Sequence, residues 1–440
     1  MNLRFHDVSS KQHKVAPHRK SHARLLRSLS VCGVMVMMLG VLAACGGSST
    51  GSTTTSDGKT VITVLDHWPT EPSNTEINTL FSQYEKLHPN ITIKRDPVPV
   101  GSLNSKIDQE AASHTLPSLI SIDNPDMASF AATGILAPLD DYLKSSGIST
   151  SDFYAGSLST MTYNNKTYGY SVGNNDLALY YNKKMFTDAG LKPPTTWSEL
   201  SSSAKKLTKG DVYGLAMAAP ATEEGSWQFE PFFWSNGGDI THVNNTNGVA
   251  ALQYVSNLVK DGSLSKSSLN WGQADVLTQF QEGHAAMMVN GPWNISLLKG
   301  KGIDYGVVSI PASAVGGKSV SPLGGEDWVI PVGDPAKQKA AWDLLNWLEQ
   351  PTQILAFDEI NGYVPPLKSE GVTMLQSHPE LAVFTNELNT AHARTAEVGA
   401  KYPTISQALW TAEQSALTGS QSPQAALDAA QTKIDATLKK

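Results

Sequence analysis

Cysteine and long hydrophobic segments are both scarce in this sequence. Its 440 residues include two cysteines, Cys32 and Cys45. The apolar run at residues 29–44 is about 16 residues long, whereas a membrane-spanning helix needs roughly 20. The run is therefore too short for a comfortable membrane span, but it suits the apolar region of a signal peptide.

The residues around Cys45 are typical of an exported protein. Basic residues precede the apolar run, Ala43 and Ala44 are small, and a Gly/Ser/Thr stretch follows the cysteine. This order resembles a bacterial lipobox, in which the cysteine is acylated and the chain is cut just before it. We predict a lipoprotein signal peptide over residues 1–44 and a lipidated Cys45 with a flexible tether over residues 45–58. A plain signal peptide or an N-terminal helix with an incidental cysteine is the alternative.

Positive charge would be scarce in the mature chain. The predicted leader carries seven of the 33 basic and one of the 40 acidic residues, so 26 basic and 39 acidic residues remain, a net charge of −13. This balance argues against nucleic acid and against electrostatic attachment to anionic lipid. Because Cys32 leaves with the leader and Cys45 is acylated, no thiol remains for a disulfide, a metal site or a nucleophile.

The remaining length suggests two domains or lobes, and the first part of the body has an alternating α/β pattern. Strands are expected at residues 61–65, 91–93 and 119–122, with helices beginning at Ser73, where the spacing to Glu76 predicts a capping box, and at Ser102. Such an order predicts a parallel sheet with right-handed crossovers. Ligands bind beyond the carboxyl ends of these strands.

The later part of the chain is richer in helices. Strands are expected at residues 177–181, 286–289 and 305–308, and helices at 249–259 and 336–349. Further helices are expected to begin at Thr196 and at Ser422-Pro423, which have N-capping residues.

Five segments resemble the extracellular solute-binding proteins of carbohydrate-uptake ABC transporters, the group that includes maltose-binding protein. They follow one another in the family's order, at residues 133–141, 176–200, 280–294, 324–331 and 425–430. The resemblance covers essentially all of the chain from Lys59 onward. It implies an α/β fold of two lobes, of the periplasmic-binding-protein type II, with hinge crossings and a ligand cleft between the lobes.

The resemblance also implies where the lobes divide. Three crossings would fall near residues 174–176, 324–327 and 362–366, so that lobe 1 holds residues 59–175 and 327–363 and lobe 2 holds residues 176–325 and 366–440. Gly324, Gly325 and Gly362 suit a hinge, because a hinge needs a few residues that absorb backbone rotation.

A sugar requires aromatic rings for its apolar faces and charged or amide groups for its hydroxyls. Among ten tryptophans we predict ligand contact for Trp68, which follows a strand end, for Trp227, in an expected loop, and for Trp293. Trp293 stands in a Gly-Pro-Trp-Asn segment whose counterpart in maltose-binding protein stacks on the sugar. Structural packing is expected for Trp197, Trp342, Trp347 and Trp410, and Trp328 could serve either role.

The remaining ligand-binding candidates lie at strand ends, at the crossings, or where many relatives place an arginine. They are Asp123, Asn124, Asn175, Asp176, Gly325, Glu326, Asp327, Tyr363 and Arg394.

No pattern in the sequence indicates catalysis, a metal site or a cofactor. It contains no Gly-x-Ser-x-Gly elbow and no zinc-ligand spacing. The segment before Lys318 and Ser319 lacks a phosphate loop's first glycine, since Ala312 stands there. We therefore expect a binding protein and not an enzyme.

The leading hypothesis is a monomeric, exported lipoprotein, anchored to the outer face of the cell membrane (the periplasmic side if the cell has an outer membrane). It would capture a mono- or oligosaccharide and deliver it to the permease subunits of an ABC transporter. One alternative is a secreted carbohydrate-active enzyme, which needs two carboxylates roughly 5–10 Å apart. Another is the same fold with a polyamine, a peptide or a phosphodiester as its ligand.

Overall fold

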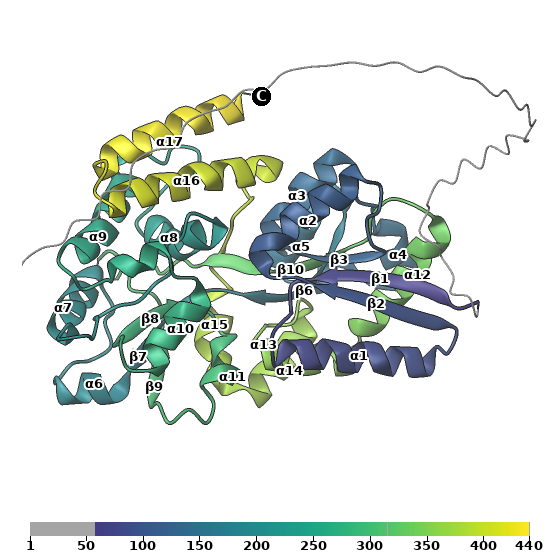
Figure 1. The fold of residues 1–440 in the computed structure, drawn as a ribbon, viewed down its shortest axis with the longest axis horizontal. Helices are drawn as coiled ribbons and strands as arrows, with labels where there is room; N and C mark the ends of the chain where they lie inside the picture. The colour runs from purple at the N-terminus through teal and green to yellow at the C-terminus, as the bar shows by residue number, and fades with distance from the viewer. Residues whose placement is uncertain (1–57, 315, 440) are drawn as a thin grey trace, which may run out of the picture. The chain divides into compact units, whose positions relative to one another are not determined.

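The computed structural model describes residues 58–314 and 316–439. Cys45, the predicted signal peptide and the tether up to residue 57 lie outside these residues. The described elements form two lobes, each with its own sheet and its own hydrophobic core (Figure 1). None of the helices in these residues is both long enough and apolar enough to span a membrane.

Lobe 1 is built on a mixed six-stranded sheet. Its strands are β1 (Thr60–Asp66), β2 (Ile91–Pro97), β3 (Leu119–Asp123), β6 (Gly169–Asn175), β10 (Pro322–Val329) and β11 (His392–Ala393). The start of β10 and the short strand β11, which pairs with it, extend this sheet to the boundary with lobe 2. Strand β1 pairs in parallel with β2 and β3, which confirms the parallel arrangement expected for the first three strands. Strand β10 then runs antiparallel to both β3 and β6, so the complete sheet is mixed.

Helices cover both faces of this sheet. They are α1 (Ser73–Leu87), α2 (Val100–Ala112), α3 (Asn124–Thr133), α4 (Asp140–Ser145), α5 (Ala155–Met161), α12 (Pro335–Leu348) and α13 (Pro351–Asn361). Because side chains alternate along a strand, Ile62 and Val64 of β1 join the core with α1 and α12, while Leu65 joins the core with α2 and α3. Figure 1 shows α1 and the pair α2 and α3 on opposite sides of the sheet.

Lobe 2 has a smaller antiparallel sheet in which β7 (Ala178–Asn182) lies between β8 (Met287–Asn290) and β9 (Tyr305–Val308). Its helices are α6 (Lys183–Asp188), α7 (Trp197–Leu207), α8 (Glu223–Ser235), α9 (Thr246–Lys260), α10 (Gln273–Gln281), α11 (Asn294–Leu298), α14 (Lys368–Ser377), α15 (Ala382–Glu387), α16 (Tyr402–Leu417) and α17 (Pro423–Leu438). Aromatic and aliphatic residues of α7, α8, α9, α16 and α17 share one core with β7 and β8.

Short elements connect these parts. They are the hairpin β4 (Thr162–Tyr163) and β5 (Lys166–Thr167) and the 3-10 turns η1 (Thr150–Asp152), η2 (Lys266–Leu269), η3 (Pro379–Leu381) and η4 (Gly399–Lys401).

The helix starts test the capping predictions. The Thr196 hydroxyl accepts the Glu199 N–H at 3.2 Å and Glu199 accepts the Thr196 N–H at 3.2 Å, so the start of α7 is confirmed as a capping box. The capping box expected at Ser73 is wrong, because the Ser73 hydroxyl instead donates to Asn361 of α13 at 2.6 Å. A long-range partner has replaced the local one. Helix α2 begins at Val100, two residues before the expected Ser102.

Three chain segments pass side by side between the lobes. Gly324 and Gly325 of β10 pair with Asn175 and Asn174 of β6. On the other side of this segment, the Asn174 N–H donates to the Val364 oxygen at 2.7 Å and the Val364 N–H donates to the Asn174 oxygen at 2.8 Å. Gly325 has a φ of 126°, and a Cβ there would collide with the backbone of β6. Glycine is therefore required where these strands cross.

Candidate functional site

A cavity of about 600 Å³ lies at the crossing of the lobes, and we call it the interlobe cleft. It is lined by residues at the ends of β1 and β3, by the middle of β10, by the starts of α2 and α3, and by residues of α8, α11 and α16. This volume is typical of small-molecule sites, which range over roughly 300–1,000 Å³. Strand ends of lobe 1 and helices of lobe 2 therefore face the same space.

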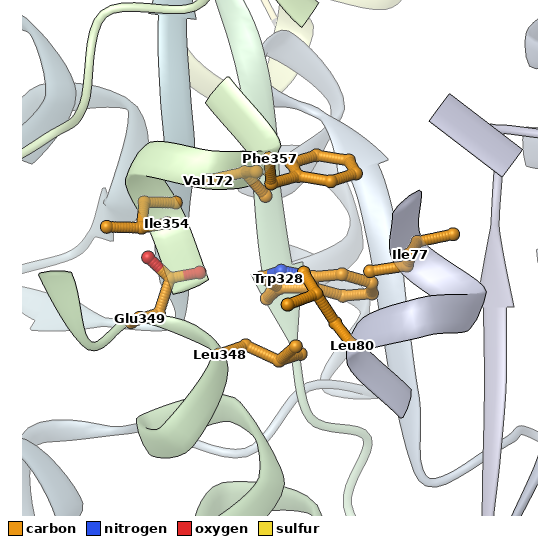
Figure 2. Close-up of a pocket in the computed structure, with 8 residues that line it drawn as sticks. All are labelled: Ile77, Leu80, Val172, Trp328, Leu348, Glu349, Ile354 and Phe357. Atoms are coloured by element: carbon orange, nitrogen blue, oxygen red, sulfur yellow. The ribbon is translucent and has the colours of Figure 1, made fainter. Parts of the chain in front are cut away.

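A second void is much smaller and lies inside lobe 1 (Figure 2). Its volume is about 10 Å³, which is near the least that one water molecule requires. It lies among apolar side chains of α1, β6, β10, α12 and α13, and burial raises the pKa of Glu349 in its wall well above the usual range. This void is a packing gap in the core of lobe 1 and offers no room for a solute.

Nine of the twelve predicted ligand-binding residues line the interlobe cleft. They are Trp68, Asp123, Asn175, Trp227, Trp293, Gly325, Glu326, Tyr363 and Arg394. The carboxyl ends of β1 and β3 thus face the cleft, as expected for strands of a parallel sheet. Whether each of these residues contacts a ligand stays a prediction.

The other three predicted residues do not line the cleft. Asn124 is buried and accepts a hydrogen bond from Arg394 at 2.9 Å. The side chains of Asp176 and Asp327 are fully buried, and burial raises the pKa of each carboxyl well above its usual range. Asp327 points away because neighbouring side chains on a strand face opposite sides, and Glu326 takes the cleft side of β10.

Four tryptophans line the cleft, three of which the sequence singled out. Trp227 lies within α8 and not in the expected loop, while Trp293 directly precedes α11 and is half-buried. Trp68 packs edge-on against Phe357, with ring centroids 4.9 Å apart. Trp410 of α16 was expected to serve packing alone. Its position lies outside the stripe of α16 that packs into the core, and an aromatic residue outside such a stripe is the signal that could have identified it.

The other tryptophans belong to the cores. Trp342 is buried in lobe 1, where its Nε1 donates to Ser146 at 3.0 Å, and Trp347 packs against the same core. Trp197 stacks on Tyr254 in lobe 2 with centroids 4.4 Å apart. The structural role expected for these three residues is confirmed. Trp328 is 2% exposed and lines the small void, so it belongs to the core as well.

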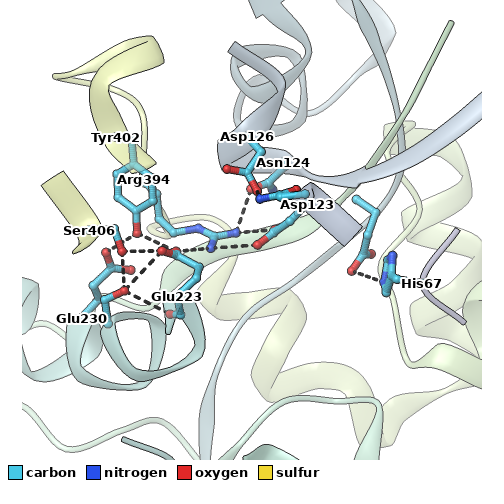
Figure 3. A network of polar contacts seen from close by, with 12 residues as sticks. His67, Asp123, Asn124, Asp126, Glu223, Glu230, Arg394, Tyr402 and Ser406 are labelled. Atoms are coloured by element: carbon cyan, nitrogen blue, oxygen red, sulfur yellow. Dashed lines mark hydrogen bonds and ion pairs between the residues drawn. The ribbon is translucent and has the colours of Figure 1, made fainter. Parts of the chain in front are cut away.

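Arg394 joins both lobes at one edge of the cleft. Figure 3 shows its guanidinium between Asp123, at the end of β3, and Glu223, at the start of α8; both carboxylates lie 2.8 Å from it. The guanidinium also lies 4.4 Å from the ring centroid of Trp227. Burial opposes the charged form, but the two carboxylates outweigh it and raise the pKa of Arg394. Arg394 is therefore a fixed cation whose partners come from both lobes.

The carboxyl groups around Arg394 continue into lobe 2. Tyr402 bridges Glu223 and Glu230, with its hydroxyl 2.8 Å from each, and Ser406 hydrogen bonds to Glu223 (Figure 3). Burial raises the pKa of Glu230 well above its usual range, with the nearby charge of Glu223 as a further cause. Burial therefore favours the neutral form of Glu230, while Glu223 faces the cleft.

Four carboxyl groups of the cleft were not among the residues predicted from the sequence, namely Glu71, Asp126, Glu223 and Glu224. Burial, with the charge of Asp123 as a further cause, raises the pKa of Asp126 to about 7, although Asn104 donates to its Oδ2 at 2.6 Å. Burial also raises the pKa of Glu224, which accepts the Gln273 N–H at 2.6 Å. Asp126 lies in the first turn of α3, directly after the strand end that the sequence did indicate.

Glu326 pairs with His67 on the lobe 1 side of the cleft, with His67 Nε2 3.2 Å from a carboxylate oxygen. Burial lowers the pKa of His67, but the hydrogen bond and charge of Glu326 exceed that effect and raise it overall. No group of His, Cys, Asp and Glu in residues 58–314 and 316–439 has the arrangement of a metal site.

A family model, "Bacterial extracellular solute-binding protein", matches residues 79–382. The match covers more than half of the sequence. The chain belongs to this family. A two-lobe α/β fold with a cleft between the lobes is the architecture on which this solute-binding protein is built.

Several relatives resemble this solute-binding protein over most of its length. A binding protein of Brucella abortus is 29% identical over 81% of this chain and 88% of its own. The maltooligosaccharide ABC transporter solute-binding lipoprotein of Streptococcus pneumoniae is 27% identical over 95% and 98%. The structure of a cyclic alpha-maltosyl-1,6-maltose binding protein from Arthrobacter globiformis is 26% identical, with a TM-score of 0.70 over 87% of this chain and 100% of the other.

Proposed function

We propose that this protein captures a mono- or oligosaccharide in the interlobe cleft and delivers it, chemically unchanged, to the permease subunits of an ABC transporter. The observation that carries the proposal is the cleft itself, where four tryptophans and several carboxyl and amide groups face one cavity of about 600 Å³. Indole rings cover the C–H faces of a sugar, and carboxylates and amides accept and donate the hydrogen bonds of its hydroxyls. Relatives named for maltooligosaccharides and maltosyl-maltose support the same ligand class.

We infer that the lobes divide at the three adjacent crossings, with residues 59–175 and 327–363 in lobe 1 and residues 176–325 and 366–440 in lobe 2. Support comes from the backbone pairing of Asn174 with Gly325 and with Val364, which gathers the crossings into one narrow strip. A narrow strip lets the lobes rotate by changing few dihedral angles. Ligand would favour the closed arrangement by its higher affinity for that state.

A screen of sugars by thermal unfolding tests the capture of a saccharide. A ligand that binds the folded state alone adds about 2.7 kcal/mol to the free energy of unfolding at a concentration of one hundred times Kd. We expect at least one sugar to raise the melting temperature and to be recovered intact by mass spectrometry after long incubation. Stabilisation by no saccharide would contradict the proposal, and cleaved or modified sugar would move the protein to the enzymes.

We further propose that the protein is a monomeric lipoprotein, exported and anchored through Cys45 to the outer face of the cell membrane. The basic, apolar, small-residue and cysteine segments occur in the required order, and the pneumococcal relative is named as a lipoprotein. Replacing Cys45→Ser should leave the precursor uncleaved or release the body from the membrane, because serine cannot form the thioether. Unchanged processing and membrane retention of that variant would refute the anchor.

A further inference from the structure

Carboxyl groups outnumber cations on the wall of the interlobe cleft. Two side chains that can carry positive charge line it, His67 and Arg394, in the part of the chain that the structure describes. Six acidic side chains line the same cavity, namely Glu71, Asp123, Asp126, Glu223, Glu224 and Glu326.

Both cations of the cleft already have protein partners. Arg394 is 3% exposed and lies 2.8 Å from Asp123 and 2.8 Å from Glu223, so two carboxylates neutralise one guanidinium. His67 pairs with Glu326 at 3.2 Å. Glu71, Asp126 and Glu224 form no ion pair with either lining cation, although the charge of Arg394 acts on Asp126 and that of Arg95 acts on Glu71. The remaining excess of acidic groups must be met by solvent or by ligand.

Asp126 is one of these carboxyls, and the charges of two further acids, Asp123 and Glu223, act on it. Four groups face it: Asn104 from α2, Asp123 from β3, Glu223 from α8, and Arg394 from the segment after β11. Burial and the two acidic neighbours raise the pKa of Asp126 to about 7, since Arg394 offsets them in part only. A neighbouring cation would shift this carboxyl towards its ionised form, which a neutral hydroxyl would not do.

We propose that the ligand is a cationic saccharide, an amino sugar, whose ammonium group is received by Asp126 while the tryptophans of the cleft cover its rings. This inference rests on the proposed function and specifies its ligand. An ammonium group donates up to three hydrogen bonds and brings the positive charge that the wall lacks. It also favours the ionised form of Asp126, so binding and deprotonation of that carboxyl support each other.

Three sets of disaccharides that differ at one substituent, an amine, an acetylated amine or a hydroxyl, test whether the ligand carries a positive charge. Disaccharides of glucosamine, of N-acetylglucosamine and of glucose, each in several linkages, would be titrated into the intact protein by calorimetry. We expect the free amine to bind at least tenfold more tightly than the acetylated and hydroxyl counterparts of the same linkage. We also expect its affinity to fall when salt is raised, because ions screen the attraction between ammonium and carboxylate.

The outcomes separate this inference from the proposed function. Equal or tighter binding of the hydroxyl or acetylated sugars would overturn the cationic ligand and leave sugar capture in place. No binding of any saccharide, or binding of a linear polyamine such as spermidine in the absence of sugar binding, would overturn both.

An isosteric variant tests the assigned residue. Asp126→Asn keeps the shape of the side chain and removes its charge, so we expect the affinity for the amino sugar to fall at least tenfold and that for its hydroxyl counterpart to change less than twofold. Asp108→Asn is the matched control, because Asp108 is exposed on α2 of the same lobe and does not line the cleft. Equal losses for both sugars in Asp126→Asn would show a structural role and contradict the assignment. If that variant does not fold, the three sets of disaccharides, titrated into the native protein, still test whether a cationic sugar is preferred.

Discussion

Two buried arginines hold strand-end aspartates in this protein, one inside lobe 1 and one between the lobes. Arg95 of β2 binds Asp66 of β1 at 2.5 and 2.7 Å and also donates to the Trp68 oxygen at 2.6 Å. Arg394 binds Asp123 of lobe 1 and Glu223 of lobe 2.

The surroundings of the two arginines differ as well. Arg95 and Asp66 are 7% and 0% exposed and form a one-to-one pair. The carboxylates that face Arg394 are 26% and 29% exposed and lie beside further acids of the cleft. The pair enclosed in lobe 1 stabilises that lobe, whereas a charge shared by two lobes also affects how they move and what binds between them.

The largest expected effect is the loss of stability when the enclosed pair of Arg95 and Asp66 is broken. Arg95→Ala leaves Asp66 buried without a cation, so the free energy of unfolding should fall by about 3–5 kcal/mol, the usual result of breaking a buried pair. Urea unfolding followed by circular dichroism measures it. The control is Lys184→Ala, which removes an exposed pair with Asp188 and should change stability by less than about 1 kcal/mol. Similar effects of the two variants would remove the distinction between enclosed and exposed charges.

A second comparison is between a tryptophan of the cleft, Trp293, and a tryptophan of the lobe 1 core, Trp342. Trp293→Ala should weaken sugar binding by about 2–4 kcal/mol, because it removes a large ring from the wall of the cleft. Trp342→Ala should instead lower the free energy of unfolding by about 3–5 kcal/mol and leave affinity nearly unchanged, since that ring lies in the core of lobe 1. Calorimetry and urea unfolding on both variants separate the two effects. Equal loss of affinity in both would be evidence against the cleft as the binding site.

Arg394 should show a smaller effect on stability than Arg95. In Arg394→Met the two freed carboxylates keep access to solvent, so we expect a loss of about 1–2 kcal/mol in the free energy of unfolding. The variant should also alter the change in radius of gyration on adding sugar, which solution scattering measures. A loss as large as that of Arg95→Ala with normal compaction would show that Arg394 is a structural residue alone.

The last prediction concerns how the stability of the protein depends on pH through Asp126. The pKa of Asp126 is raised from 3.8 to about 7 in the folded protein, so between these values the folded state binds more protons at this site than the unfolded state. Its contribution to stability is therefore lost as pH rises through this window. Asp126→Asn should match the native protein near pH 4 and be the more stable of the two at pH 8. Urea unfolding at both pH values checks this, and a variant less stable than the native protein at pH 8 would contradict it.

Much of lobe 1 was predictable because its signals are local. The β-branched runs at β1 and β3 and the apolar spacing of α1 reflect residues that contact one another within a few positions. The prediction failed where a distant partner competed. Ser73 has the spacing of a capping box, yet its hydroxyl bonds to Asn361, 288 positions away in the chain.

Residues of the candidate site, too, were predicted where the signal is local and missed where it depends on tertiary packing. Strand-end position predicted that Trp68 and Asp123 face the cleft, because the rule depends only on where a strand stops. Asp126 and Glu224 lie on helices that reach the cleft through the packing of both lobes, and no local pattern distinguishes them from surface residues. Trp410 also lies on such a helix, and its only local signal is its place outside the core stripe of α16. Asp176 and Asp327 have the carboxyl groups expected for contact with sugar hydroxyls, but both are buried and do not line the cleft.

The family, the alternation of strands and helices, and the residue types available to hold a sugar could all be predicted from the sequence, because they depend on composition and on spacing along the chain. The tertiary structure alone decided which carboxyl groups share the cleft and which of them lack a cation. Charge interactions depend on distance through space and on burial. Asp123, Glu223 and Arg394 are separated by up to 271 positions in sequence and meet at hydrogen-bond distance only in the folded chain.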